Sequence, residues 1–469
     1  MKSIQPYQQY KPSNIDWLGE IPEHWEEVKG KWVWKKEKRP VRKEDEVVTA
    51  FRDGEVTLRK NRREEGFTVS LQEIGYQGIR KGDLVIHGMD AFAGAIGVSD
   101  SDGKSSPVYS ACTSVKDADP YFFSYLLKEM SRRGWIECLA KGIRERSTEF
   151  RFSEFASLIY PLPTSSEQQA ITAFLDHKCA QIDLFIEKKY QLIELLKEQK
   201  QAIINQAVTK GINPEVGLKD SDVEWLGEIP VHWEVKKLKF VTSRLSRGTT
   251  PDYIESSPFK VINQATFSRG FFDTSSIRFH KANSIYGLKG QVRKGDILLA
   301  STGGGVLGKC FFYDLPNEDF IADSHVTIVR TKDEILISRF LYLFLSINFN
   351  LIEGYLGQGA TNQTELQSGW LGGLLVAFPD KYEQERIVSY LDREVFKIDQ
   401  AISRIEKEIA LTKEYKQSLI SEAVTGKMDV RSRKLSASEL PELNNEQDLV
   451  VAPELLESYT SHSGDPEIQ

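Results

Sequence analysis

The chain has 469 residues, 40% hydrophobic and 10% aromatic, which is enough for two to four packed domains. It contains no run of about 18 apolar residues, and its polar first ten residues lack the apolar core of a secretion signal, so we expect neither a membrane span nor a signal peptide. The four scattered cysteines have no paired spacing for zinc or redox chemistry, and they favour ordinary thiols in a reducing cytoplasm.

The net charge of −7 arises from the C-terminal tail. Residues 435–469 hold eight acidic side chains and no Lys or Arg, which leaves 61 basic and 60 acidic groups in the rest of the chain. The tail has few large apolar residues, and we expect residues 429–469 to be a disordered, solubilising extension. Because the remainder is balanced in charge, any basic face must be a local patch.

A Trp-rich segment occurs twice. Residues 10–25 are YKPSNIDWLGEIPEHW and residues 222–233 are DVEWLGEIPVHW, so that Trp17 aligns with Trp225 and Trp25 with Trp233. Two Trp, an Ile and a Pro in so short a stretch favour a structural latch at the start of each half. An aromatic cage for a ligand is the alternative.

Each latch is followed by a region that has diverged between the halves, residues 26–160 and 234–375. The two share short islands, among them KGDLVI at 81–86 and KGDILL at 294–299. Each island indicates a turn into a short buried strand, and a helix is predicted after it, at 120–130 and at 337–351. Each region is therefore expected to be an α+β domain with a short, mixed sheet.

A long helix closes each half. Residues 163–209 recur at 379–425 with a constant offset of 216, and apolar residues lie three and four apart in both copies. Thr164 with Glu167, and Asp380 with Glu383, have the spacing of an N-cap and its return partner. Gly211 and Gly426 stand where the helices should end.

Each helix would be a rod about 60 Å long, which cannot bury its apolar stripe alone. The rods could pack separately, each on its own domain, or on each other as an antiparallel coiled coil. The second arrangement predicts a helix-pair interface made of Ile186, Ile193, Leu196, Ile402, Ile405 and Ile409. The expected domains are then 1–160, 161–212 (first helix), 213–376, 377–428 (second helix) and the tail 429–469.

Polar, irregular segments precede both long helices, GIRERSTEFR at 142–151 and GQGATNQTELQ at 357–367. Their basic and amide side chains suit phosphates and base edges, although an ordinary solvated loop is the alternative. With the basic and hydroxyl groups nearby, the predicted DNA-binding residues are Arg59, Lys60, Arg62, Arg63, Arg144, Arg146, Arg247, Thr249, Thr250, Lys309, Asn362, Gln363 and Thr364.

Catalytic motifs are weak. Residues 303–310, GGGVLGKC, approach a phosphate-binding loop, but Cys310 replaces the Ser or Thr that would hold magnesium. The sequence that follows is typical of a strand rather than the helix such a loop needs. The glycines are better explained as turn positions. No catalytic residue or metal ligand is predicted.

The duplicated pattern resembles the specificity (S) subunit of type I restriction–modification enzymes. The resemblance rests on the two W-L-G-E-I-P-x-H-W segments, the two K-G-D islands and the two P-x-x-x-E-Q-x-x-I helices, and covers residues 10–430. It implies two target recognition domains separated by two long antiparallel helices, each domain recognising half of a split double-stranded DNA sequence. The acidic tail has no role in that pattern.

The resemblance also implies partners. Two modification subunits would hold S-adenosylmethionine, restriction subunits would use ATP and magnesium, and this subunit would hold no cofactor or catalytic residue. Two half-sites on one DNA face lie about 34 Å apart, a spacing that a rod of about 60 Å could set. The rival hypotheses are a coiled-coil scaffold that binds only protein, and a self-contained NTPase that uses residues 303–309.

Overall fold

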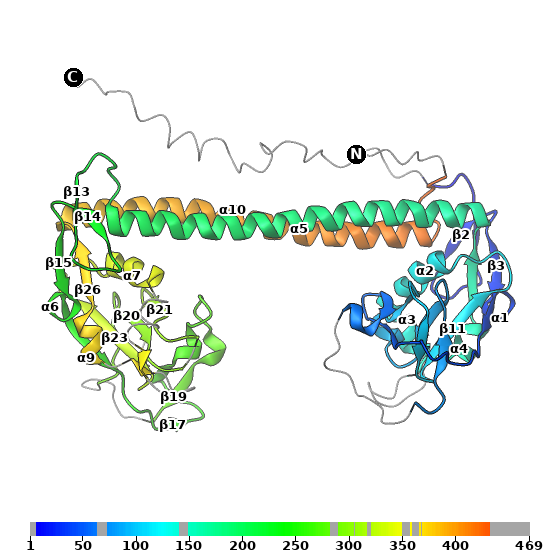
Figure 1. Ribbon diagram of the computed structural model, residues 1–469, viewed down its shortest axis with the longest axis horizontal. Coiled ribbons are helices and arrows are strands. Elements are labelled where there is room, and N and C mark those ends of the chain that lie inside the picture. The colour runs from blue at the N-terminus through cyan, green and yellow to red at the C-terminus, as the bar shows by residue number, and fades with distance from the viewer. Residues whose placement is uncertain are drawn as a thin grey trace, which may run out of the picture. The chain divides into compact units, whose positions relative to one another are not determined.

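The computed structural model describes residues 6–62, 73–139, 149–281, 289–303, 305–316, 320–348, 357–358, 365–366 and 368–431. They divide into two compact units, unit 1 (Met1–Tyr190 with Glu406–Gln469) and unit 2 (Gln191–Ile405). The long helices α5 (Ser165–Lys210) and α10 (Lys381–Val424) each contribute residues to both units (Figure 1). The predicted tail, from residue 432 onward, lies outside the described residues.

Unit 1 is built on a four-stranded sheet of order β4-β11-β8-β9. Its helix α2 runs below α5 and α10 (Figure 1). The strands of the unit are β1 (Tyr10–Pro12), β2 (Glu20–Pro22), β3 (Glu26–Lys29), β4 (Trp34–Lys36), β5 (Val48–Ala50), β6 (Val56–Leu58), β7 (Gln77–Ile79), β8 (Leu84–His87), β9 (Ile96–Val98), β10 (Gly103–Ser105), β11 (Tyr109–Ser114) and β12 (Ile159–Leu162). Its shorter helices are α1 (Gly30–Val33), α2 (Pro120–Arg132), α3 (Trp135–Leu139) and α4 (Phe152–Ser157).

Unit 2 repeats this frame with a sheet of order β16-β23-β20-β21 and adds a second sheet, β17-β19-β18-β22. Its strands are β13 (Leu218–Asp220), β14 (Glu228–Pro230), β15 (Glu234–Lys237), β16 (Thr242–Arg247), β17 (Tyr253–Ile254), β18 (Lys260–Ile262), β19 (Arg278–His280), β20 (Ile297–Ala300), β21 (Cys310–Phe312), β22 (Phe320–Ala322), β23 (Val326–Thr331), β24 (Gly357–Gln358), β25 (Glu365–Leu366) and β26 (Leu375–Phe378). Its shorter helices are α6 (Leu238–Val241), α7 (Ser338–Ile347) and α9 (Ser368–Gly373).

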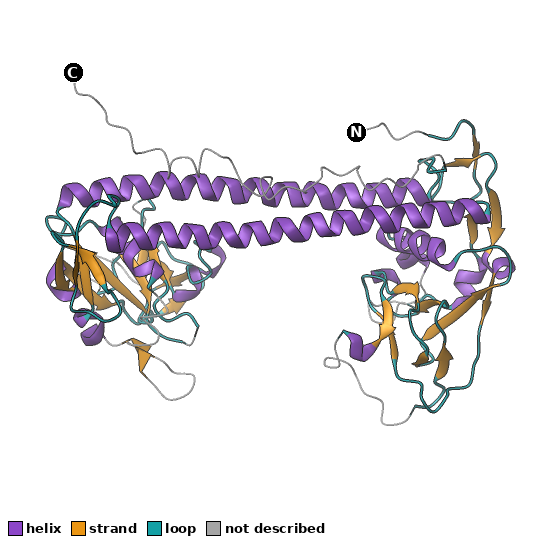
Figure 2. Ribbon diagram, turned by 45° about the horizontal axis from the view of Figure 1, so that its top comes forward, coloured by secondary structure: helices purple, strands orange, loops and turns teal. Residues whose placement is uncertain are grey.

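Helices and strands occur together in both units, as expected for an α+β protein (Figure 2). The expected mixed sheet is wrong for the shared four-stranded sheets, because every strand pair in them is antiparallel. Short connections between consecutive strands such as β8 and β9 favour antiparallel pairing. A parallel pair, β18 with β22, occurs in the second sheet of unit 2, where a long stretch of chain separates the strands.

The long helices run antiparallel within each unit. In unit 1, Lys416 of α10 lies 2.6 Å from Asp183 of α5, and Lys189 lies 3.1 Å from Glu408, so the partner number falls as the α5 number rises. In unit 2, Lys200 lies 2.7 Å from Asp399. Five of the six predicted interface residues are buried, and Ile402 is half-buried.

The helix ends agree with the predicted stops, since Gly211 and Gly426 follow α5 and α10 with φ of 77° and 74°. The predicted capping boxes are wrong in part. Asp380 does cap α10, accepting the Glu383 N–H at 2.9 Å. The Thr164 hydroxyl instead lies 3.2 Å from Ser166 Oγ, and neither glutamate returns to its cap.

Candidate nucleic-acid interface

Three of the predicted basic residues of unit 1, Arg59, Lys60 and Arg62, are described, and they lie in one turn after β6 near acidic side chains. Lys60 Nζ lies 2.5 Å from Glu46, and the Arg62 guanidinium lies 2.7 Å from Asp53 and covers the Phe51 ring. Arg59 is half-buried and donates to Thr49 Oγ1 at 3.2 Å. The positive charges of Lys60 and Arg62 are therefore largely neutralised by neighbouring carboxylates.

The predicted residues of unit 2 are not all brought together. Arg247 ends β16 and donates to the Leu366 carbonyl at 3.1 Å, and Thr249 and Thr250 follow after Gly248. Lys309 precedes β21, at the other edge of the sheet β16-β23-β20-β21. Arg63, Arg144, Arg146, Asn362, Gln363 and Thr364 lie outside the described residues.

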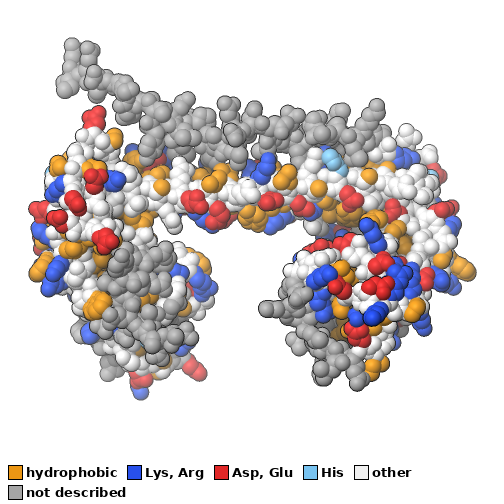
Figure 3. Space-filling view, in the orientation of Figure 1, with side chains coloured by type: hydrophobic (Ala, Val, Ile, Leu, Met, Phe, Trp, Pro, Cys, Tyr) orange, Lys and Arg blue, Asp and Glu red, His pale blue; other side chains and the backbone are white. Residues whose placement is uncertain are grey.

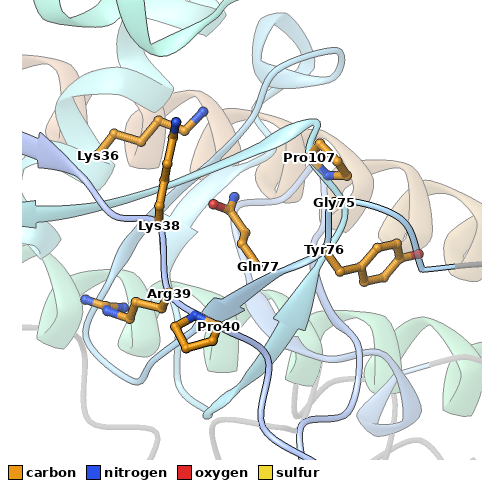
Figure 4. Close-up of a pocket in the computed structure, with 8 residues that line it drawn as sticks. All are labelled: Lys36, Lys38, Arg39, Pro40, Gly75, Tyr76, Gln77 and Pro107. Carbon is orange, nitrogen blue, oxygen red and sulfur yellow. The ribbon is translucent and has the colours of Figure 1, made fainter.

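A basic pocket in unit 1 was missed by the sequence analysis. It encloses about 370 Å³ and is lined by Lys36, Lys38, Arg39, Pro40, Gly75, Tyr76, Gln77 and Pro107 (Figure 4). None of these eight lining residues is acidic. Within the described part of the chain, neither Lys36 nor Lys38 forms an ion pair or a side-chain hydrogen bond. The pocket therefore offers two ammonium groups that no described carboxylate neutralises.

The carboxylate between the two lysines in sequence is bound elsewhere. Lys36, the last residue of β4, and Lys38 both line the pocket, whereas Glu37 does not. The Glu37 carboxylate accepts from the Thr113 hydroxyl at 2.7 Å and lies 3.4 Å from Lys35. The hydrogen bond from Thr113, more than the neighbouring Lys35, holds the pKa of Glu37 below its usual value. The run KKEKR at 35–39 was the sequence signal for the pocket.

Each K-G-D island supplies a buried aspartate that forms ion pairs, and the first island does so beside the pocket. Asp83 is buried, accepts from the Arg80 N–H at 2.8 Å and pairs with Arg39, a residue of the pocket wall. In unit 2, Asp296 accepts from the Arg293 N–H at 2.7 Å and from Arg330 Nε at 2.7 Å. A buried carboxylate needs such charged partners, so the islands are structural ion-pair sites. The first island, through Asp83, holds Arg39 in place and neutralises its charge.

The two latches bind the glutamates that were expected to cap the long helices. The Tyr7 hydroxyl and Trp25 Nε1 donate to Glu167 Oε1 at 2.6 and 3.1 Å, and His24 Nε2 lies 2.9 Å from Oε2. In unit 2, Trp233 Nε1 donates to Glu383 at 3.3 Å, and His232 Nε2 lies 2.6 Å away. The Trp and His side chains serve these carboxylates, which favours the latch over an aromatic ligand cage.

Each latch also meets the end of a long helix. A Cβ on Gly426 would collide with Pro22 and lie 3.1 Å from the Trp25 ring. A Cβ on Gly211 would lie 3.6 Å from the Trp233 ring. In unit 1, Tyr10 pairs with Pro22 in the β1–β2 ladder, so the first latch lies beside the end of α10.

The described residues contain no group of three or more His, Cys, Asp or Glu side chains placed to hold a metal ion. None of the described helices is both long and apolar enough to cross a membrane. The glycine-rich residues 303–309 lie between β20 and β21, and a strand rather than a helix follows Lys309. The phosphate-loop hypothesis lacks its required helix, whereas a turn between strands fits.

On the face shown in Figure 3, Lys and Arg side chains are interspersed with Asp and Glu. Unpaired basic groups, rather than a broad basic face, therefore mark the candidate site in unit 1.

Comparison with known proteins finds one matching family model and several similar proteins. Residues 230–411 match the model of the type I restriction modification DNA specificity domain. The MjaVIII specificity subunit of a type I restriction enzyme from Methanocaldococcus jannaschii is 25% identical over 423 residues, which are 88% of this chain and 95% of that relative. The chain is thus a relative of type I restriction enzyme specificity subunits, as its repeated motifs predicted. The relatives are named as specificity subunits, which also confirms the prediction of a non-catalytic subunit.

Solved structures share the fold. A chain from a study of complex assembly and conformational transition of the type I R-M system aligns with a TM-score of 0.65 at 15% identity, covering 87% of this chain and 99% of that one. The HsdS subunit from Thermoanaerobacter tengcongensis aligns with a TM-score of 0.53 at 17% identity, covering 89% and 100%. The mixed helix and strand architecture is therefore one already seen in these solved structures.

Proposed function

We propose that this chain recognises a split, asymmetric double-stranded DNA target and directs its methylation and restriction by partner subunits. One observation carries the proposal: the two units share one frame, β4-β11-β8-β9 and β16-β23-β20-β21, but differ in what is inserted into it. A common frame with different insertions suits two recognition regions for two different half-sites. Residues 26–160 and 234–375 are the proposed recognition regions.

The partners follow from the relatives, which are named as subunits of larger enzymes. Two modification subunits would supply the methyl transfer with S-adenosylmethionine, and restriction subunits would supply cleavage with ATP and magnesium. In this proposal α5 and α10 pair as an antiparallel coiled coil through Ile186, Ile193, Leu196, Ile402, Ile405 and Ile409. The burial of most of these side chains and the ion pairs between the helices support it.

DNA contacts are proposed at two kinds of site. The polar segments before the long helices, with Arg144, Arg146, Asn362, Gln363 and Thr364, remain candidates for base recognition. In unit 1, Lys36 and Lys38 are stronger candidates for phosphate contacts than Lys60 and Arg62, because no described carboxylate neutralises them.

A domain exchange tests the function. Residues 234–375 are replaced by the equivalent region of another specificity subunit, and methylation of genomic DNA is mapped in cells that express the modification subunits. We expect one half of the methylated sequence to change and the other to stay. A simultaneous change in both halves contradicts two independent recognition regions. If duplex DNA is not bound even with modification subunits present, the protein-only scaffold is favoured instead.

A further inference from the structure

The residue after Glu167 makes a second, separate connection. Gln168 is fully buried on α5, and its Oε1 accepts the Asp119 N–H at 2.8 Å. Its Nε2 donates to the Asp117 carbonyl at 2.9 Å and to the Pro163 carbonyl at 2.8 Å. Both amide hydrogens are used, so the orientation of the side chain is fully determined. The bond to Asp119 is made at the residue that caps helix α2.

Unit 2 repeats this arrangement atom for atom. Gln384 is fully buried, and its Oε1 accepts the Ile337 N–H at 2.8 Å, at the N-cap of α7. Its Nε2 donates to the carbonyls of Ile335 and Pro379 at 3.0 and 2.9 Å. In each unit, two of the three hydrogen bonds therefore attach the start of the principal helix of the recognition region to the long helix. The third binds the carbonyl of the proline that precedes the long helix.

All six bonds reach backbone atoms. The glutamines therefore hold the loop in the same way although its residues differ, Asp117 and Asp119 in unit 1 and Ile335 and Ile337 in unit 2. A neighbouring contact, by contrast, depends on which side chain the recognition region supplies. Asp176 accepts from the Tyr125 hydroxyl at 2.7 Å, whereas its counterpart Asp392 binds Arg339 Nη2 at 2.9 Å. That contact changes with the recognition region, and the glutamine contact does not.

From this duplicated geometry we infer that Gln168 and Gln384 are positioning residues, each of which sets the placement of its recognition region on the long helix. They thereby determine which spacing between half-sites the protein accepts. The inference rests on the proposed split target. In this inference neither glutamine contacts DNA, so the base preference within each half-site does not depend on them.

The test measures methylation by the full chain with its modification subunits on duplexes whose half-sites are one base pair closer, correctly spaced, or one base pair farther apart. Gln168→Ala removes all three bonds and leaves the partly buried Asp119 N–H without this partner. We expect its preference for the correct spacing to fall about tenfold, with unchanged base preference in both half-sites. Gln191→Ala, at an exposed glutamine of the same helix, is the matched control and should keep the wild-type preference.

Gln168→Asn, which shortens the side chain by one methylene, and Gln384→Ala give independent readings if Gln168→Ala does not fold. A lower melting temperature with an unchanged spacing preference in the folded variants overturns the inference and leaves the glutamines as stabilising residues only. If the wild-type assembly accepts all spacings equally, the proposed split target fails rather than the role of the glutamines.

Discussion

At the scale of single residues, the basic side chains of unit 1 differ in whether a carboxylate neutralises them. Lys60 and Arg62 are exposed but lie against Glu46, Asp53 and Glu55. Binding a phosphate there would require breaking those pairs, whereas Lys36 and Lys38 can bind a phosphate without that cost. Each lysine that neutralises a phosphate releases counterions, which makes the affinity depend on salt.

We therefore expect the double change Lys36→Ala and Lys38→Ala to make the negative slope of log affinity against log salt shallower by about 1.8, or about 0.9 for each phosphate that is no longer neutralised. The matched double change Lys60→Ala and Arg62→Ala should alter the slope by less than half as much. Fluorescence anisotropy with a target duplex at several salt concentrations measures both. Equal slopes for the wild type and the Lys36/Lys38 variant would exclude the pocket as a phosphate site.

At the scale of elements, the long helices have one face that is buried and one that is not. The adjacent residues Leu195 and Leu196 of α5 differ sharply, with exposed fractions of 57% and 5%. Ile193, which is buried like Leu196, is 4% exposed. An apolar stripe on a helix of this length is stabilised by packing rather than by helix propensity.

Leu196→Asp should destabilise the helix pairing of unit 2 by about 3–5 kcal/mol, because it removes a buried side chain and places a carboxylate in apolar surroundings. Leu195→Asp is its control, with the same chemical change at an exposed position, and should cost less than about 0.5 kcal/mol. Urea unfolding followed by circular dichroism gives both values. Similar losses in the two variants would mean that the helix face is wrongly assigned.

At the scale of the whole molecule, each unit is completed by chain segments that are distant in sequence. Unit 1 combines the first latch with the residues that follow α10, where the Arg431 guanidinium lies 5.0 Å from the Tyr7 ring and binds Asp429 at 2.7 Å. Unit 2 makes the corresponding junction at Gly211 within the continuous chain. In unit 1, by contrast, no continuous chain joins the end of α10 to the first latch. The contacts of Tyr7 and Arg431 lie at this junction.

A circular permutant should fold if these contacts are kept. We expect a short linker from Arg431 to Pro6, with new termini at the exposed Pro214, to preserve the melting temperature within a few degrees. A junction from Met428 to Asn14 deletes Tyr7, β1 and Arg431, and should be clearly less stable. Differential scanning calorimetry compares them. Equal stability of the two permutants would show that the Tyr7 and Arg431 contacts are dispensable.

The sequence by itself determined the repeat, the long helices, their glycine ends and the resemblance to type I specificity subunits. These features follow from local periodicity, from conformational limits such as positive φ at Gly211 and Gly426, and from identities at a constant offset. It also predicted an α+β frame, although not the antiparallel pairing of the shared sheets. The set of predicted DNA-binding residues stays a prediction, since part of it lies outside the described residues.

Only the tertiary structure decided which groups these residues meet. Glu167 has the spacing of a capping residue, yet its partner Tyr7 is 160 residues away in the sequence. Gln168 reaches Asp119, and Arg39 reaches Asp83, across 49 and 44 residues. Lys60 and Arg62 look unpaired in the sequence, but folding brings carboxylates against them. Burial and ion pairing depend on through-space neighbours, and a local pattern carries no information about neighbours that the fold brings from elsewhere in the chain.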